Sequence, residues 1–103
     1  MHNDPVLSML GIAAKSGNVV SGEFSTEKAV KTGHAYLVIV SAEASGNTKK
    51  SFCNMTDFYH VPCYCYGSKE ALGRCIGKEF RASLAVTDEN LAKAVEKKLK
   101  EHT

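Results

Sequence analysis

Residues 35–42 read AYLVIVSA, a run of apolar and β-branched side chains with the length of a strand. A strand with one face in water alternates apolar and polar residues, and this run does not. The pattern therefore predicts a strand that is covered on both faces, and it is the strongest strand signal in the sequence.

Helical patterns lie on both sides of this run. Upstream, the spacing predicts a helix from about Gly22 to Thr32, with Ser21 as its N-cap and Gly33 after its end. Downstream, the cluster 45–47 is expected to open another helix. The apolar face of that helix comprises Phe52, Met55 and Tyr59.

Strands continue to alternate with helices farther from the run. A first helix is expected from Asp4-Pro5 to Gly17, and Ser68 and Asp88 are expected to cap two more. The other short segments of β-forming residues are 19–20, 62–66 and 80–86. This alternation predicts an α/β fold with one domain over residues 1–103, a three-layer α/β/α sandwich with a mixed four-stranded sheet and helices on both faces.

Composition limits the function only loosely. The 103 residues are 44% hydrophobic, which is enough to bury a core without disulfides or metal, and the net charge of +2 does not indicate a polyanion partner. No apolar run approaches the roughly 20 residues that span a bilayer, and the N-terminus has no basic, signal-like region. A cytoplasmic protein with no membrane partner is therefore expected.

Four cysteines, Cys53, Cys63, Cys65 and Cys75, are candidates for chemistry. Their C-x9-C-x-C-x9-C spacing contains no C-x2-C pair and matches a zinc clamp poorly, so they are interpreted as buried free thiols. No pattern supplies a base for a cysteine nucleophile, and no glycine-rich phosphate loop or hydrolase motif is found. We therefore expect no catalytic residue, no metal and no cofactor.

The positions of the basic residues are more informative than their number. Several lie where helices begin or loops turn, and loops at one edge of a layered sandwich converge. One phosphate-binding patch is therefore expected from Lys15, Lys28, Lys49, Lys69 and Arg81. The alternative is an evenly mixed, solvated surface, as is usual for charged side chains.

Two stretches resemble a known family. Residues 22–33 (GEFSTEKAVKTG) are similar to the pattern G-x-N-E-x-x-K-x-x-x-x-G of the L7Ae-type, kink-turn-binding ribosomal proteins, in which a central strand follows. Residues 61–77 (VPCYCYGSKEALGRCIG) resemble that family's Val-Pro strand, Ser-Lys cap and Leu-Gly-x-x-x-Gly helix. The resemblance runs from about Val6 to Val95 and, within the family, points to the bacterial YlxQ-type branch.

The resemblance implies a non-catalytic RNA-binding protein, associated with the ribosome or translation, that contacts structured RNA through the start of its second helix and neighbouring loops. The implied partners are kink-turn-like RNA, including ribosomal RNA, and ribosomal or ribonucleoprotein proteins, and a monomer is expected. The implied RNA-binding residues are Gly22, Phe24, Ser25, Lys28, Lys31, Ser45, Lys49, Lys69, Lys78, Phe80 and Arg81.

The sequence departs from the family at two of these positions. Phe24 and Ser25 stand where the family has the Asn and Glu that read guanine edges, so specificity for a standard kink-turn is expected to be weaker or altered. We expect Phe24 to pack into the core; the alternative is that it stacks on a splayed base. The departures also favour a second hypothesis, a protein-interaction or ribosome-assembly factor that has lost base-specific readout and exposes an apolar patch at the same edge.

Overall fold

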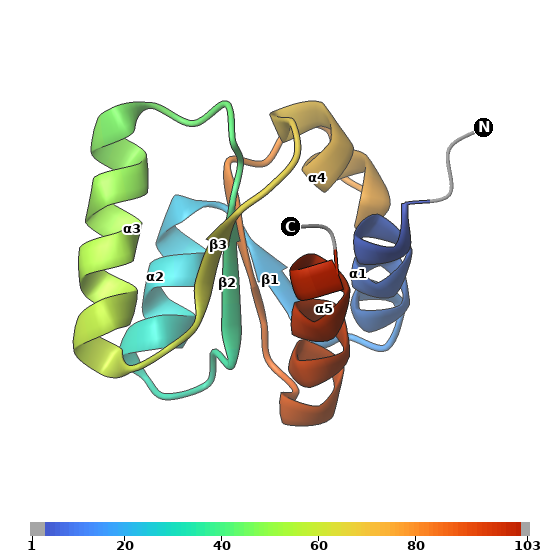
Figure 1. Ribbon diagram of the computed structural model, residues 1–103, viewed down its shortest axis with the longest axis horizontal. Helices are drawn as coiled ribbons and strands as arrows, with labels where there is room; N and C mark the ends of the chain where they lie inside the picture. Colours follow the sequence, from blue (N-terminus) through green and yellow to red (C-terminus); the bar gives the residue numbers. More distant parts are fainter. Residues whose placement is uncertain (1–3, 102–103) are drawn as a thin grey trace.

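The computed structural model describes residues 4–101, in which helices alternate with strands (Figure 1). The helices are α1 (Pro5–Lys15), α2 (Glu23–Lys31), α3 (Gly46–Tyr59), α4 (Lys69–Cys75) and α5 (Glu89–Glu101). The strands are β1 (Val19–Ser21), β2 (Leu37–Val40), β3 (Cys63–Cys65) and β4 (Ser83–Val86). No helix within these described residues is long and apolar enough to cross a membrane.

The strands form one mixed sheet in the order β1-β4-β2-β3. β2 is parallel to β3, with Val38 opposite Cys63, and β4 is antiparallel to both β1 and β2. Strands β1, β2 and β3 therefore all end at the same edge of the sheet, which is the edge where β4 begins. We refer to this edge as the upper edge and to the opposite one as the lower edge.

Helices cover both faces of the sheet. Figure 1 shows α2 and α3 on one side and α1 and α5 on the other, with α4 near α1 at the upper edge. The predicted three-layer α/β/α sandwich with a mixed four-stranded sheet is thus confirmed.

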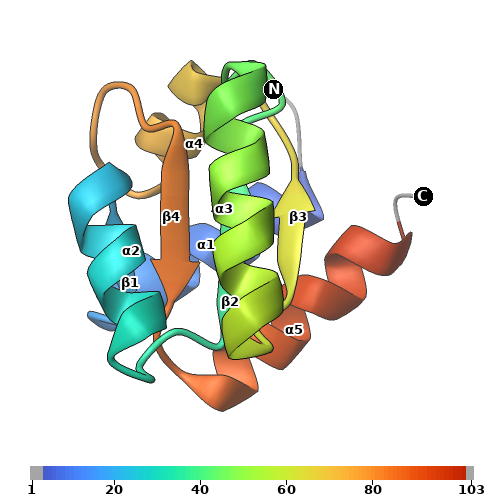
Figure 2. The ribbon, with the colours of Figure 1, turned by 90° about the vertical axis from the view of Figure 1, so that its left-hand side faces the viewer.

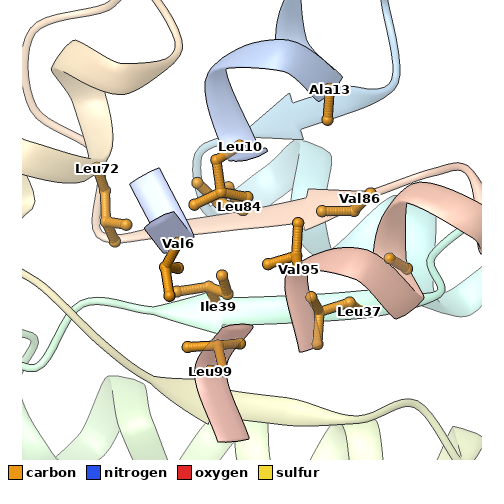
Figure 3. Close-up of a cluster of buried hydrophobic side chains, with 11 residues drawn as sticks. Val6, Leu10, Ala13, Leu37, Ile39, Leu72, Leu84, Val86, Val95 and Leu99 are labelled. Carbon is orange, nitrogen blue, oxygen red and sulfur yellow. The ribbon is translucent and has the colours of Figure 1, made fainter. Parts of the chain in front are cut away.

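The buried side chains of β2 divide between two core layers. Leu37 and Ile39 belong to the layer beneath α1 and α5 (Figure 3). Val38 and Val40 belong to the layer beneath α2 and α3. All four side chains are fully buried, which is why residues 35–42 show no polar alternation.

Four of the helices begin with a side-chain cap at the position that the sequence indicates, whereas the predicted cap of α2 is wrong. Asp4, Ser45, Ser68 and Asp88 accept hydrogen bonds from the first turns of α1, α3, α4 and α5. Ser21, however, does not cap α2. The cap position is Gly22, whose φ of 93° and ψ of 159° suit glycine almost alone, while the Ser21 hydroxyl accepts a hydrogen bond from Arg81 instead.

Three of the strands are shorter than the sequence indicates, and β1 (Val19–Ser21) is one residue longer than the predicted 19–20. β2 covers residues 37–40 of the predicted 35–42, and β3 covers 63–65 of the predicted 62–66. β4 begins at Ser83 instead of Phe80, because residues 78–82 form a loop that packs on α4. Tyr59, expected on the apolar face of α3, is exposed, and Thr56 takes the buried position of that last turn.

Candidate nucleic-acid interface

The upper edge gathers most of the residues that the resemblance implies. Helices α2, α3 and α4 begin there, because each follows a strand that ends there. Figure 2 shows the first turns of α2 and α3 at the same end of the molecule as α4 and the loop that leads into β4. The implied residues that lie at this edge are Gly22, Phe24, Ser25, Ser45, Lys49, Lys69, Lys78, Phe80 and Arg81.

Arg81 connects three of these segments. Its Nε donates to Ser21 Oγ at 2.9 Å, and its Nη1 donates to the Phe80 carbonyl at 2.7 Å. Its backbone N–H donates to the Lys69 carbonyl at 3.0 Å. Beside it, the N–H of Gly22 donates to the Ser83 carbonyl at 2.9 Å. The start of α2, the start of α4 and the loop 78–82 are therefore held as one surface.

Gly73 allows the loop 78–82 to lie against α4. A Cβ at this position would overlap the carbonyl group of Glu79 and lie 2.9 Å from the Phe80 nitrogen. The Lys78 N–H also donates to the Gly73 carbonyl at 2.8 Å. The loop thus has a fixed position because α4 presents backbone there and no side chain.

The charge of the upper edge is mixed. Lys69, Lys78 and Arg81 lie there, but so do Glu43 and Glu79, and Glu43 accepts from the Lys69 backbone N–H at 3.0 Å. Attraction of RNA to this edge would depend on individual contacts more than on a strong positive field.

Three predicted basic residues, Lys15, Lys28 and Lys31, lie outside the upper edge. Lys15 is the last residue of α1 and lies close in sequence to Asn18. The Asn18 carbonyl accepts a hydrogen bond at 2.8 Å from the N–H of Thr87, which follows the end of β4. Lys15 therefore lies at the lower edge. The prediction that Lys15 belongs to one basic patch with Lys28, Lys49, Lys69 and Arg81 is therefore wrong. Lys31 ends α2 and pairs with Glu27 at 2.6 Å; this hydrogen bond, helped by the Glu27 charge, raises the pKa of Lys31. Lys28 is exposed midway along α2.

Phe24 does not pack into the core, so that expectation is wrong. Its side chain is 78% exposed in the first turn of α2. The reason is positional, because the buried face of α2 consists of Thr26, Ala29 and Val30. Phe80 is likewise exposed, so the upper edge carries two phenyl groups in solvent.

Comparison of this sequence with known proteins shows the family to which the chain belongs. Residues 4–96 match the model of the ribosomal protein L7Ae/L30e/S12e/Gadd45 family. The chain belongs to this family. A relative named RNA-binding protein YlxQ, from Bacillus subtilis, is 40% identical over 84 residues, covering 82% of this chain and 84% of the relative. The large ribosomal subunit protein eL30 of Sulfolobus acidocaldarius is 34% identical over 84 residues, covering 80% and 81%.

Solved structures agree with this L7Ae/L30e-family fold. A protein of unknown function from Bacillus halodurans superposes with a TM-score of 0.92 at 33% identity, covering 95% of this chain and 99% of that one. The 15.5kD RNA binding protein of Giardia lamblia gives a TM-score of 0.80 at 22% identity, covering 98% and 90%, and shows likeness of fold alone. The curated relatives are named as RNA-binding and ribosomal proteins and not as enzymes.

The cysteines of this L7Ae/L30e-family chain do not all conform to the expectation of buried thiols. Cys53 and Cys65 are exposed, because β3 is an outer strand and the outer face of α3 meets solvent. Cys63 and Cys75 are half-buried, and desolvation raises the pKa of each thiol to about 11. Within residues 4–101, no group of three or more His, Cys, Asp or Glu side chains could hold a metal ion.

Thiol labelling should therefore resolve two classes of cysteine. At pH 8 we expect Cys53 and Cys65 to react rapidly with a disulfide reagent, and Cys63 and Cys75 to react slowly, since a thiol with a pKa of about 11 is only about 0.1% thiolate there. Raising the pH toward 10 should accelerate the slow class about tenfold per unit. The Cys53→Ser/Cys65→Ser variant should lack the fast class, and four equal rates would contradict this assignment.

Proposed function

We propose that this chain is a non-catalytic, single-domain RNA-binding protein that acts as a monomer on ribosome- or translation-associated RNA through its upper edge. Its family membership and the names of its relatives support RNA binding. The observation that carries the choice of surface is Arg81, which holds the starts of α2 and α4 and the loop 78–82 together. A surface fixed in this way can bind a folded RNA without reordering.

The proposed ligand is a kink-turn-like RNA that is read less specifically than in the family pattern. Gly22 allows close backbone approach, and the side chains of Lys28, Lys69 and Lys78 supply phosphate contacts. Neither Phe24 nor Ser25 offers the amide or carboxylate that reads a guanine edge. Each bidentate base contact that is absent removes about 1–3 kcal/mol of discrimination.

The test is binding to an RNA with a kink-turn and to a matched duplex without its G·A pairs, over a series of salt concentrations. We expect preference for the kink-turn. Lys28→Gln and Lys69→Gln should each weaken binding and reduce the slope of log affinity against log salt by about 1. Lys97→Gln, an exposed lysine on α5, is the matched control and should change neither quantity.

A second candidate function is a ribosome-assembly or protein-interaction factor on the same fold. The exposure of both Phe24 and Phe80 at the upper edge favours it, since a protein partner would cover apolar side chains that water otherwise contacts. Equal, weak binding of the two RNAs would exclude specific kink-turn recognition and favour this alternative.

A further inference from the structure

A hollow of about 610 Å³ lies beside α2, along the outer side of the sheet where β1 is the last strand. Its walls include Val20 of β1, Thr87 after β4, and Phe24, Ser25 and Lys28 of α2. The volume falls in the range of pockets that hold small organic ligands. The hollow extends from the first turn of α2, which is part of the upper edge, toward the lower edge at His34.

The side chain of Phe24 gives this hollow an aromatic wall. The residue lies at the second position of α2, and its ring is mostly in solvent. Within residues 4–101, the one aromatic ring pair is Phe58 with Tyr59, so Phe24 has no stacked partner among these residues. A planar ligand is the natural complement of an exposed ring, because stacking buries both faces that meet.

The hollow is also suited to an anion. No Asp or Glu lines it, whereas Lys28 does. Of the two carboxylates on α2, Glu23 lines neither this hollow nor the smaller one of about 230 Å³ that Phe24 and Lys28 also line, and Glu27 lines only the smaller one. Glu27 is paired there with Lys31 at 2.6 Å.

His34 adds a hydrogen-bond acceptor. The Thr32 hydroxyl donates to the Lys28 carbonyl at 2.7 Å and lies 2.8 Å from Nδ1 of His34, which can donate to it in the tautomer that carries the proton on Nδ1. In that tautomer Nε2 is a hydrogen-bond acceptor, and His34 lines the hollow.

From this combination of aromatic wall, lysine and acceptor, we infer that the hollow binds one unpaired nucleotide of single-stranded RNA. The base stacks on the ring of Phe24, and its phosphate pairs with Lys28. This inference rests on the proposed function and deepens it: where the family pattern reads base edges, this chain takes one base that is out of the helical stack.

The experiment uses the intact protein and the pentamer UU-(2-aminopurine)-UU as a single-stranded probe. We expect quenching of the 2-aminopurine fluorescence and NMR amide shifts at Val20, His34 and Thr87. Phe24→Leu should weaken binding about 5- to 150-fold and abolish the quenching, because a stacked base contributes about 1–3 kcal/mol. Phe24→Tyr retains the ring and should bind within about threefold of the wild type.

Phe58→Leu is the matched control, since Phe58 is 75% exposed, lies in the last turn of α3 and does not line the hollow. It should bind as the wild type does. Equal binding by Phe24→Leu, or no binding of the pentamer at millimolar concentration, would overturn the inference even if the kink-turn RNA binds normally. Pentamer binding that depends on Phe24, with no preference for the kink-turn over its duplex, would support the nucleotide site and reject the proposed structured-RNA function.

Discussion

Gly73→Ala is expected to lower the free energy of unfolding by about 3 kcal/mol or more. A methyl group at this position overlaps the carbonyl of Glu79 and crowds the nitrogen of Phe80. Both are backbone groups, so the overlap is relieved only if the loop 78–82 moves away from α4. Urea unfolding followed by circular dichroism measures the loss.

The other glycines in helices provide a graded control. At Gly46, in the first turn of α3, an added Cβ meets nothing within 4 Å, and at Gly11 it meets the Cys75 carbonyl at 3.1 Å. We expect Gly46→Ala to change stability by less than about 0.5 kcal/mol and Gly11→Ala to have an intermediate effect. If Gly73→Ala is as stable as Gly46→Ala, the loop is not held against α4.

The same substitution bears on RNA binding. Movement of the loop would separate Arg81 from Ser21 and from the start of α4, and the upper edge would lose its fixed arrangement. A Gly73→Ala protein that remains folded at low temperature should therefore bind structured RNA more weakly. Gly46→Ala should bind as the wild type does.

Ile39→Ala should lower the free energy of unfolding by about 2–5 kcal/mol, an effect of similar size to that of Gly73→Ala. Ile39 is fully buried in the central strand β2 and lies opposite Leu84 and Tyr64 on the two neighbouring strands. The substitution removes three carbons from the core layer beneath α1 and α5, which can close only partly around the space. Chemical denaturation again provides the measurement.

Ile12→Ala is the matched control for this prediction. Ile12 lies on α1 and is 55% exposed, and alanine has a higher helix propensity than isoleucine. The stability should therefore change by less than about 0.5 kcal/mol. Losses of equal size at positions 12 and 39 would be incompatible with the core described for this fold.

Local signals were sufficient for most of the fold. The run at residues 35–42 predicts a strand covered on both faces, and the side chains at Ser68 and Asp88 predict helix starts that the structure contains. Such features depend on residues within a few positions of one another. The start of α2 depends on a distant residue instead, because the Ser21 hydroxyl accepts a hydrogen bond from Arg81, which is 60 residues away.

The candidate site was less predictable because it depends on strand direction. Helices that follow β1, β2 and β3 begin at the upper edge, whereas α1 precedes β1 and ends at the lower edge. Lys15, at the end of α1, is therefore remote from Lys69 at the start of α4. The rule that helix starts and helix ends lie at opposite edges could have separated them from the sequence alone. The exposure of Phe24 could not be found in this way, since it depends on which face of α2 meets the sheet.

The two outer strands, β1 and β3, have three residues each, and proline precedes the first residue of β3. Outer strands of this length offer very few free N–H and C=O groups along which another chain could align, and proline offers no donor at all. Crowding many copies of this protein together, as at a site of dense ribonucleoprotein assembly, should therefore not lead to strand exchange or fibre growth through the sheet edges.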